Sequence, residues 1–294
     1  MISKKELATE IDYLASLKTI METFEEIAAS RIQKIRSSVL GSRDFLMEVN
    51  SVFQQVKYSY KNEVNKLLKQ KKINKAKQMS FINHNGKNLF AVVCSNTGFY
   101  GDIVRRTFNL FAKEFKKAIA NKNKNDAVII GRVGLQFFQE EFSSTPFTYF
   151  DFPDDKTDEE AFKNIIAHLI QYESVIVFYA RFQNIITQEP TGTSISGDRL
   201  DLDNQPKEGV KYFFEPSLEN IMGFFEKQIF ASIFEQTMLE SRLAKFASRM
   251  VTLDSAADNT KSRLKQMLFV RERIRHSAMN KKQMEALSSH ILWQ

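Results

Sequence analysis

Apolar side chains recur every three or four residues along the N-terminal part of the chain, from position 7 to position 60. The repeat skips a turn only near Lys18 and Ser42. A stripe this narrow is typical of a coiled-coil seam rather than of the broad buried face of a globular helix. The seam positions are Leu7, Ile11, Leu14, Met21, Phe24, Ala28, Ile32, Ile35, Val39, Leu46, Val49, Phe53, Val56 and Tyr60. We therefore predict a long N-terminal helix that needs a helical partner.

A second stripe of the same kind follows the C-terminal part of the chain. Its positions are Met222, Phe225, Ile229, Leu239, Leu243, Phe246, Met250, Leu253, Ala257 and Leu264. The two stripes can bury each other in an antiparallel pair, in which the numbers of facing residues add to about 274. At 1.5 Å per residue, a C-terminal helix of about 75 residues is about 30 Å longer than an N-terminal helix of about 56 residues. The C-terminal helix is therefore predicted to project beyond its partner.

Glycine and proline mark the boundaries between the parts of the chain. All five prolines and eight of the ten glycines lie between residues 86 and 216. We predict an N-terminal coiled-coil arm at residues 1–85, a Rossmann-like α/β domain at residues 86–209, and a C-terminal coiled-coil arm at residues 210–294. The predicted fold class is therefore α/β, with a long antiparallel two-helix coiled coil formed by both termini and a small doubly wound domain inserted between them.

Strand-like and helical runs alternate in the middle part. Strands are predicted at residues 89–95, 127–131, 174–187 and 210–214, and helices at residues 102–121, 133–142 and 158–172. A polar loop is predicted at residues 191–205. Helices between strands indicate a small, largely parallel sheet with helices on both faces.

The net charge of +7 is unevenly distributed. From residue 240 to the end there are eleven basic and five acidic side chains. Such a basic helix can face solvent, nucleic acid, a membrane surface or an acidic protein socket. No apolar run approaches the length of about 18 to 20 residues that spans a bilayer, so no membrane span is predicted. The single cysteine, Cys94, excludes an intrachain disulfide and suits a reducing cytoplasm.

No local motif carries the groups that catalysis or cofactor binding needs. The turn Gly98-Phe99-Tyr100-Gly101 stands where a phosphate loop would lie, but it lacks the lysine and hydroxyl of a P-loop. We interpret it as a tight turn between a strand and a helix. The acidic positions near residue 200 lack calcium-site spacing, and the four histidines lack metal-site spacing. A lysine run at residues 66–77 has no interleaved aromatic residues, which favours a solvated helix end or connector over a nucleic-acid site. We predict no catalytic residue, no cofactor and no metal.

Three stretches of the chain resemble motifs of one family, the gamma subunit of F-type ATP synthases. Residues 27–31, IAASR, are similar to the family's VAAS followed by a basic residue. Residues 95–101, SNTGFYG, are similar to its SDRGLCGG turn. Residues 247–259, ASRMVTLDSAADN, are similar to its A-R-M-x-A-M-x-x-A-x-D-N run. The resemblance implies a non-catalytic central rotor stalk that turns inside a hexamer of alpha and beta ATPase subunits, with an epsilon-like subunit and a rotor base as further partners.

The resemblance also implies which residues contact the catalytic subunits. In the family, an arginine of the ARM run and an arginine–glutamine pair grip an acidic loop, and Arg249, Arg275 and His276 stand at those positions. Phe24 stands where the family has K-A-M, and Glu285 survives from the C-terminal motif. The predicted contact residues are Phe24, Arg249, Arg275, His276, Asn280, Lys282 and Glu285, and the predicted bearing tip is Ile291, Leu292 and Trp293.

Two departures from the family concern the output of the rotor. His276 replaces the glutamine, and Lys282 reverses an acidic position. The complex is expected at the cytoplasmic face of the cell membrane, driving proton or ion transport, or other mechanical work such as motility. A static coiled-coil adaptor predicts the same fold, and a nucleotide-dependent enzyme with helical arms is a further alternative.

Overall fold

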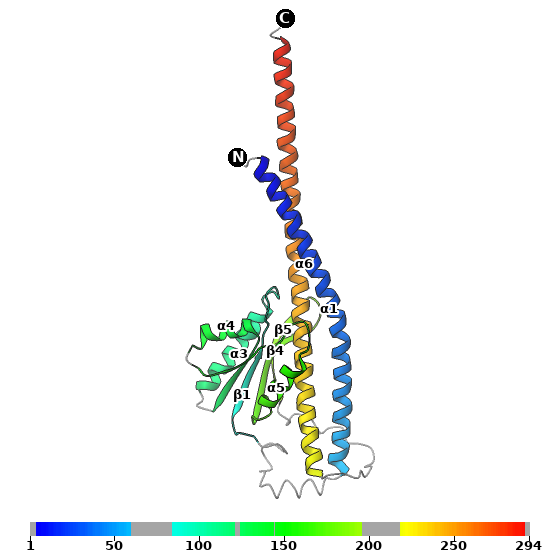
Figure 1. Cartoon of the computed structure of the whole chain (residues 1–294), viewed down its shortest axis with the longest axis vertical. Helices are drawn as coiled ribbons and strands as arrows, with labels where there is room; N and C mark the ends of the chain where they lie inside the picture. Colours follow the sequence, from blue (N-terminus) through cyan, green and yellow to red (C-terminus); the bar gives the residue numbers. More distant parts are fainter. Residues whose placement is uncertain (1–3, 60–83, 121–123, 144, 196–217, 292–294) are drawn as a thin grey trace. The chain divides into compact units, whose positions relative to one another are not determined.

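The computed structural model describes residues 4–59, 84–120, 124–143, 145–195 and 218–291 (Figure 1). Two helices dominate it, α1 (Lys4–Ser59) with 56 residues and α6 (Leu218–Ile291) with 74 residues. Both lengths agree with those predicted from the apolar stripes. No helix in these ranges is long and apolar enough to cross a membrane.

The chain divides into two compact units. One unit, called the helical unit below, consists of Met1–Ala29 and Arg249–Gln294; the other, the α/β unit, is Ser30–Ser248. The helices α1 and α6 contribute to both units. The predicted boundaries after residues 85 and 209 stay a prediction.

An antiparallel helix pair makes up the helical unit. Leu7 and Ile11 of α1 pack against Met267 of α6, and further apolar contacts come from Leu14, Leu264, Leu268 and Ile274. Glu10 and Arg263 form an ion pair at 3.5 Å. Met21 accepts a hydrogen bond at 3.7 Å from the hydroxyl of Thr260. Because rising numbers on α1 meet falling numbers on α6, the predicted antiparallel coiled coil is confirmed.

A five-stranded sheet forms the centre of the α/β unit, in the order β3-β2-β1-β4-β5. The strands β1, β2, β3 and β4 run parallel, and β5 pairs antiparallel with β4 at the edge. The strands are β1 (Asn88–Val93), β2 (Asn125–Ile130), β3 (Thr148–Phe150), β4 (Ser174–Phe182) and β5 (Gln188–Ser194).

Helices cover both faces of this sheet. On one face lie α3 (Ile103–Ala120) and α4 (Arg132–Glu141), as Figure 1 shows. The contact of α3 with the sheet is aromatic, with Phe115 against Phe90 and Phe111 against Phe178. The other face packs against α5 (Glu159–Leu169) and against Phe230 and Phe234 of α6. The sheet is therefore doubly wound, as predicted, and α6 itself serves as one of its covering helices.

The predicted course of the chain after residue 182 is partly wrong. The run at residues 174–187, predicted as one strand, is β4 followed by a tight turn, and the predicted polar loop begins inside β5. The turn forms because the side-chain oxygen of Asn184 accepts hydrogen bonds from the backbone N–H groups of Ile186 and Thr187. The strand predicted at residues 210–214 lies outside the described residues.

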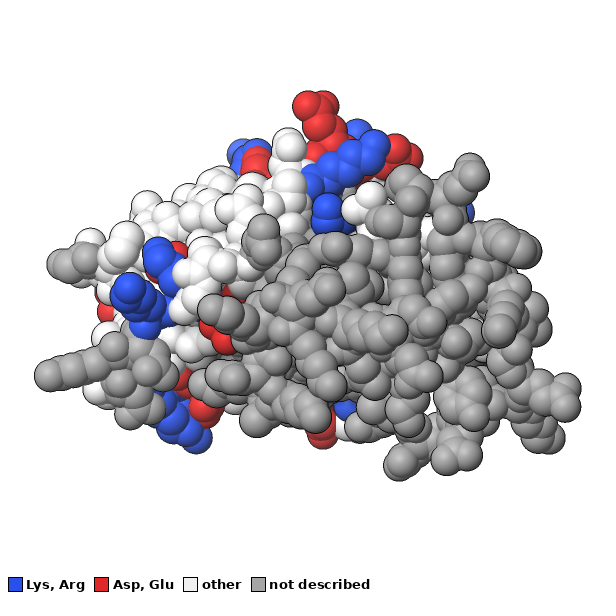
Figure 2. Space-filling model, turned by 90° about the horizontal axis from the view of Figure 1, so that it is seen from below, with Lys and Arg blue, Asp and Glu red and all other residues white. Residues whose placement is uncertain are grey.

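Charges of both signs share the surface at one end of the molecule. Where the structure describes that end, lysine and arginine side chains lie beside aspartate and glutamate side chains (Figure 2). Within this view, the described surface carries no broad field of one sign.

Candidate functional site

In the helical unit, α6 continues past the end of α1. Ile274 is the last α6 residue that packs against the cluster around Leu7 and Met267. Of residues 275–288, none is buried. Figure 1 shows this stretch of α6 running on beyond the N-terminal end of α1. We call residues 275–291 the overhang, and it confirms the predicted projection of the C-terminal helix.

The overhang has two chemically different faces. The seam that is apolar at Ala257, Leu264 and Met267 continues, in steps of three and four, to Lys281 and Glu285. These two side chains form an exposed ion pair at 3.9 Å. Steps of four and three on another face join His276, Asn280, Met284 and Leu287, of which Met284 and Leu287 are each more than 60% exposed. Once α1 has ended, the seam side of α6 is therefore charged, and Met284 and Leu287 are presented to solvent on another face.

The predicted contact residues lie along the helical unit and do not converge on one pocket. Arg275, His276, Asn280, Lys282 and Glu285 are all exposed on the overhang. Arg275 forms an ion pair with Glu272 at 3.3 Å. Arg249 is half-buried and lies 26 residues earlier on α6, which is about 39 Å along the helix axis. Of the predicted bearing tip, Ile291 ends α6, and Leu292 and Trp293 lie outside the described residues.

Phe24 was predicted both as a seam residue and as a contact residue, and the structure excludes the first role. Its side chain is 51% exposed. The seam passes from Met21 through Glu25 to Ala28, because these positions keep the steps of four and three. Burial at the seam, together with the charges of Asp254, Glu22, Glu26 and Asp258, raises the pKa of Glu25 above its ordinary value. Phe24 therefore faces away from the seam.

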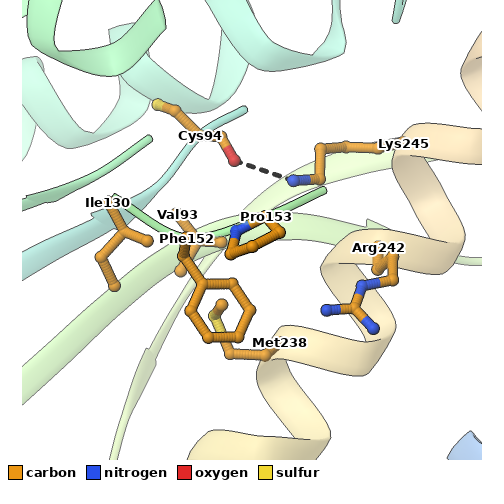
Figure 3. Close-up of a pocket in the computed structure, with 8 residues that line it drawn as sticks. All are labelled: Val93, Cys94, Ile130, Phe152, Pro153, Met238, Arg242 and Lys245. Carbon is orange, nitrogen blue, oxygen red and sulfur yellow. Dashed lines mark hydrogen bonds between the residues drawn. The ribbon is translucent and has the colours of Figure 1, made fainter. Parts of the chain in front are cut away.

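The most constrained polar group of the described residues is a buried ion pair in the α/β unit. Lys245 of α6 donates hydrogen bonds to the Cys94 carbonyl at 2.8 Å and to Oδ1 of Asp154 at 3.0 Å. Figure 3 shows the lysine reaching from α6 toward Cys94. Both side chains of the ion pair are 7% exposed. Nearby, Arg242 donates to the Lys156 carbonyl at 3.0 Å and to the hydroxyl of Thr157 at 3.2 Å.

The second carboxylate oxygen of Asp154 fixes the turn that follows β1. Oδ2 accepts hydrogen bonds from the backbone N–H groups of Asn96 and Thr97, both at 2.9 Å, and from the hydroxyl of Thr97 at 3.0 Å. Backbone N–H groups after a parallel strand are the donors that a nucleotide phosphate would use. Here the chain's own carboxylate takes them. The interpretation of residues 98–101 as a tight turn agrees with this geometry.

Burial alone would raise the pKa of Asp154, but its partners reverse the effect. The charge and hydrogen bond of Lys245, and the N–H groups of Asn96 and Thr97, together hold the pKa of this carboxyl below its ordinary value. Burial raises the pKa of Cys94 to about 12, so the thiol stays protonated and is a poor nucleophile at neutral pH. Burial also lowers the pKa of Arg242.

The space around this ion pair is too small for a metabolite. The cavity beside Lys245 measures about 10 Å³, near the lower limit for one water molecule, and Figure 3 shows its lining by Phe152, Pro153 and Met238. Among the described residues, no group of three or more histidine, cysteine or acidic side chains could hold a metal ion. The arrangement can attach a helix to a sheet, and it offers no group for chemistry.

Sequence reasoning missed this ion pair. Asp154 and Lys245 are 91 positions apart. The available signal was Lys245 itself, a lysine flanked by the apolar residues Leu243, Ala244, Phe246 and Ala247. Ser248 gives a similar signal, since it donates a hydrogen bond to the Tyr100 carbonyl at 2.8 Å.

Comparison with known proteins finds relatives along nearly the whole chain. A family model described as ATP synthase matches residues 3–289. An ATP synthase gamma chain of Ruthia magnifica subsp. Calyptogena magnifica is 22% identical and covers 98% of each chain. An ATP synthase gamma chain of Wolbachia sp. subsp. Drosophila simulans (strain wRi) is 26% identical and covers 95% of each chain.

A solved structure shares the fold. It comes from the central stalk and c-ring of the Tetrahymena thermophila mitochondrial ATP synthase. The match has a TM-score of 0.55 at 19% identity, and it covers 81% of this chain and 99% of that chain. At this identity the likeness supports the fold alone.

Proposed function

Because the chain belongs to the family of ATP synthase gamma chains, non-catalytic subunits of the central stalk, we propose how its two units divide the work of a rotor. The helical unit is the part that turns inside the ring of alpha and beta subunits. The α/β unit passes the rotation to the base. The overhang carries this proposal, because none of its side chains from residue 275 to residue 288 is buried, including the apolar Met284 and Leu287 and the charged Lys281 and Glu285.

The fixed attachment of α6 to the sheet supports the division. A rotor must transmit torque between the two ends of its shaft without slipping. Lys245 and Asp154 join α6 to the loops after the parallel strands through buried, charge-assisted hydrogen bonds. Such bonds are hard to break, because separation leaves a buried charge unpaired. We assign to this pair the transfer of torque between α6 and the sheet.

Within the helical unit, we assign the contacts with the ring to the predicted residues. Arg249 and Arg275 would bind acidic side chains of the catalytic subunits, while His276, Asn280, Lys282, Glu285 and Phe24 would lie against the same subunits. The apolar end at Ile291, Leu292 and Trp293 would form the bearing. We place the complex at the cytoplasmic face of the cell membrane, where the single, buried cysteine would remain reduced.

The test is ATP hydrolysis by the complex that copurifies with the tagged chain. Replacing Arg249 and Arg275 together by alanine should lower turnover by about tenfold or more, because two charge-assisted contacts with the ring are lost. The matched control replaces Arg106 and Lys117, two exposed basic residues of α3, and should leave turnover unchanged. Unchanged turnover and assembly in the first variant would reject the assigned contacts. Copurification of partners that hydrolyse no ATP would favour a static adaptor.

A further inference from the structure

Within the α/β unit, the seam of α1 repeats so regularly that it does not by itself fix the position of α1 along α6. Phe53 packs on Phe225 of α6, with ring centroids 5.9 Å apart. A slide of α1 by seven residues, about 10 Å along the axis, puts apolar seam residues in the places of other apolar seam residues. The seam positions here, apolar except for one serine, are Ile32, Ile35, Val39, Ser42, Leu46, Val49, Phe53 and Val56.

Two arginines of α1 make polar contacts beside this seam. Arg31 lies 3.7 Å from the carboxylate of Asp155 and donates a hydrogen bond to the Asp155 carbonyl at 3.4 Å. Arg43 lies 3.6 Å from the carboxylate of Glu240. The side chains of Arg31 and Arg43 are 39% and 53% exposed, so each ion pair contributes little to stability. Their positions along the helix are more informative than their strength.

The first acceptor, Asp155, is fixed with respect to α6. It lies in the loop between β3 and α5, and its two neighbours in the chain bind α6. Asp154 accepts a hydrogen bond from Lys245 at 3.0 Å, and the Lys156 carbonyl accepts one from Arg242 at 3.0 Å. The contact of Arg31 with this loop therefore sets where α1 lies along α6.

The second acceptor, Glu240, belongs to α6 and is held from two further sides. Its side chain is 15% exposed. It accepts hydrogen bonds from the hydroxyl of Tyr179 in β4 at 3.4 Å and from the amide of Gln236 at 3.2 Å. Polar groups beside an apolar seam specify the register of a helix pair. Glu240 is placed to do so for Arg43.

The spacing of the two arginines distinguishes the present register from its heptad neighbours. Arg31 and Arg43 are 12 residues apart, which is not a multiple of seven. One slide puts Arg36 in the place of Arg43, so Glu240 keeps a cation. The same slide puts Phe24 in the place of Arg31, and that ion pair is lost. The opposite slide brings uncharged side chains to both places, Ser38 and Asn50.

We propose that Arg31 and Arg43 are register keys, side chains that hold α1 at one position along α6 and prevent the two helices of the shaft from sliding past each other under load. The ion pair of Lys245 and Asp154 fixes α6 to the sheet, but it does not include α1. The mechanical consequence rests on the proposed function. The register itself is a property of the chain alone, so its test does not depend on the ring subunits.

The experiment measures the register in the full-length chain. Nitroxide spin labels are attached through Ser37→Cys in α1 and Lys227→Cys in α6, both exposed positions of the α/β unit, in a Cys94→Ala background. Double electron–electron resonance gives the distribution of distances between the labels. One heptad slide changes this distance by about 10 Å. The chain with both arginines should show a single distance.

Replacing the keys by Arg31→Gln and Arg43→Gln should favour the slide that brings Arg36 to Glu240. A second population should appear at a distance about 10 Å shorter, because this slide carries the label on α1 toward the label on α6. Its share should rise by about tenfold over the parent, because the present register loses both ion pairs and the slid register keeps one.

Two controls separate register from charge. Lys34→Gln with Arg36→Gln removes the same charge from exposed residues of the same helix and should leave the parent distance unchanged. Arg31→Lys with Arg43→Lys keeps both cations and should also keep the parent distance.

Three results would overturn the inference. The first is a single, unchanged distance in the double glutamine variant when circular dichroism shows intact helices. The second is a shift of equal size in the Lys34 and Arg36 control. The third is loss of helix in the double glutamine variant, since the arginines would then hold the fold itself instead of selecting a register.

Discussion

Two stretches of α6 differ in the burial of their polar side chains. Residues 241–248 of α6 are all buried, including Arg242, Lys245 and Ser248, and each of these polar side chains has a hydrogen-bond partner in a strand-end loop. Residues 275–288 include no buried side chain, and their described ion pairs are exposed. In the first stretch the chain fixes its own geometry. In the second stretch the side chains are exposed to solvent.

This difference sets how much each stretch tolerates change. A buried charge is stabilised only by its own partner, so the loss of that partner is severe. An exposed charge is already solvated by water, and its partner contributes little. Stability measurements on the chain alone can therefore separate positions that hold the fold from positions that serve an assembly.

The largest effect is expected when Lys245 is replaced by methionine. The variant keeps the length of the side chain but leaves the carboxylate of Asp154 buried without its cation. The free energy of unfolding should fall by about 3–5 kcal/mol, measured by denaturant titration. Replacing Asp154 by asparagine in the same chain should recover part of this loss, because the amide oxygen can still accept from Asn96 and Thr97. An unchanged free energy of unfolding in the Lys245 variant would show that the ion pair does not hold α6 against the sheet.

Gly131 offers a second way to disturb the same region. Its backbone has φ of 99°, and a Cβ atom would lie 2.9 Å from the backbone nitrogen and oxygen of Ser95. Replacing Gly131 by alanine should destabilise the chain by about 2–3 kcal/mol, because both the strain and the clash involve backbone. Thermal unfolding measures the change. Gly98 is the control, since no atom lies within 4 Å of an added Cβ there, and its alanine variant should unfold close to the parent chain.

In the helical unit, replacing Glu25 by glutamine should stabilise the chain by a few tenths of a kcal/mol at pH 7. The folded pKa of this carboxyl is raised, so its charge destabilises the fold above that pKa, and the penalty disappears as the pH falls toward the unfolded value. The parent chain should therefore gain stability relative to the variant between pH 7 and pH 4. Melting temperatures across this range test the sign, with the exposed Glu48→Gln variant as control. An equal pH dependence in parent and Glu25 variant would contradict the assignment.

The smallest effect is expected for Arg275→Ala. The side chain is 65% exposed, and its ion pair with Glu272 lies within one helical turn. The free energy of unfolding should change by no more than about 0.5 kcal/mol, as measured by denaturant titration. A loss above about 1 kcal/mol would place Arg275 with the residues that hold the fold. The exposed and the buried stretch of α6 would then not differ in how strongly their charged side chains stabilise the fold.

The helices were predictable because their periodicity is long. The apolar stripes of α1 and α6 repeat over many turns, so a single irregular position changes little. The register was also close, since Glu10 faces Arg263 and Met21 faces Thr260, giving sums of 273 and 281 against the predicted value of about 274. The two sums differ from the predicted value by one and by seven residues, which is at most about two helical turns.

Strands β3 and β5 could not be predicted with the same method. β3 has only three residues, too few to show alternation, and β5 contains Pro190 and Gly192, which read as loop residues. Both are edge strands whose pairing is decided by a neighbour distant in the sequence. The Lys245–Asp154 pair was missed for the same reason.

The orientation of Phe24 could not be predicted for another reason. Phe24 fits the apolar repeat of the seam, and with Tyr13, Ile20 and Ile27 it also fits a second apolar repeat on α1. A helix with two apolar stripes shows both in its sequence. Which stripe meets α6 becomes clear only when the burial of Glu25 and the exposure of Phe24 are known.

Lys245 contacts the sheet beside the point where the strand order reverses. The strand order reverses between β1 and β4, and in open doubly wound sheets the crevice outside such a reversal is where small molecules bind. In this chain Asp154 occupies the position of an anionic ligand group, and Lys245 extends the occupant into α6. The shaft helix is held by the sheet as a permanently bound ligand would be. The crevice that such sheets leave open to a diffusing molecule is thus filled by side chains of the chain itself, and α6 is held there by a group that cannot diffuse away.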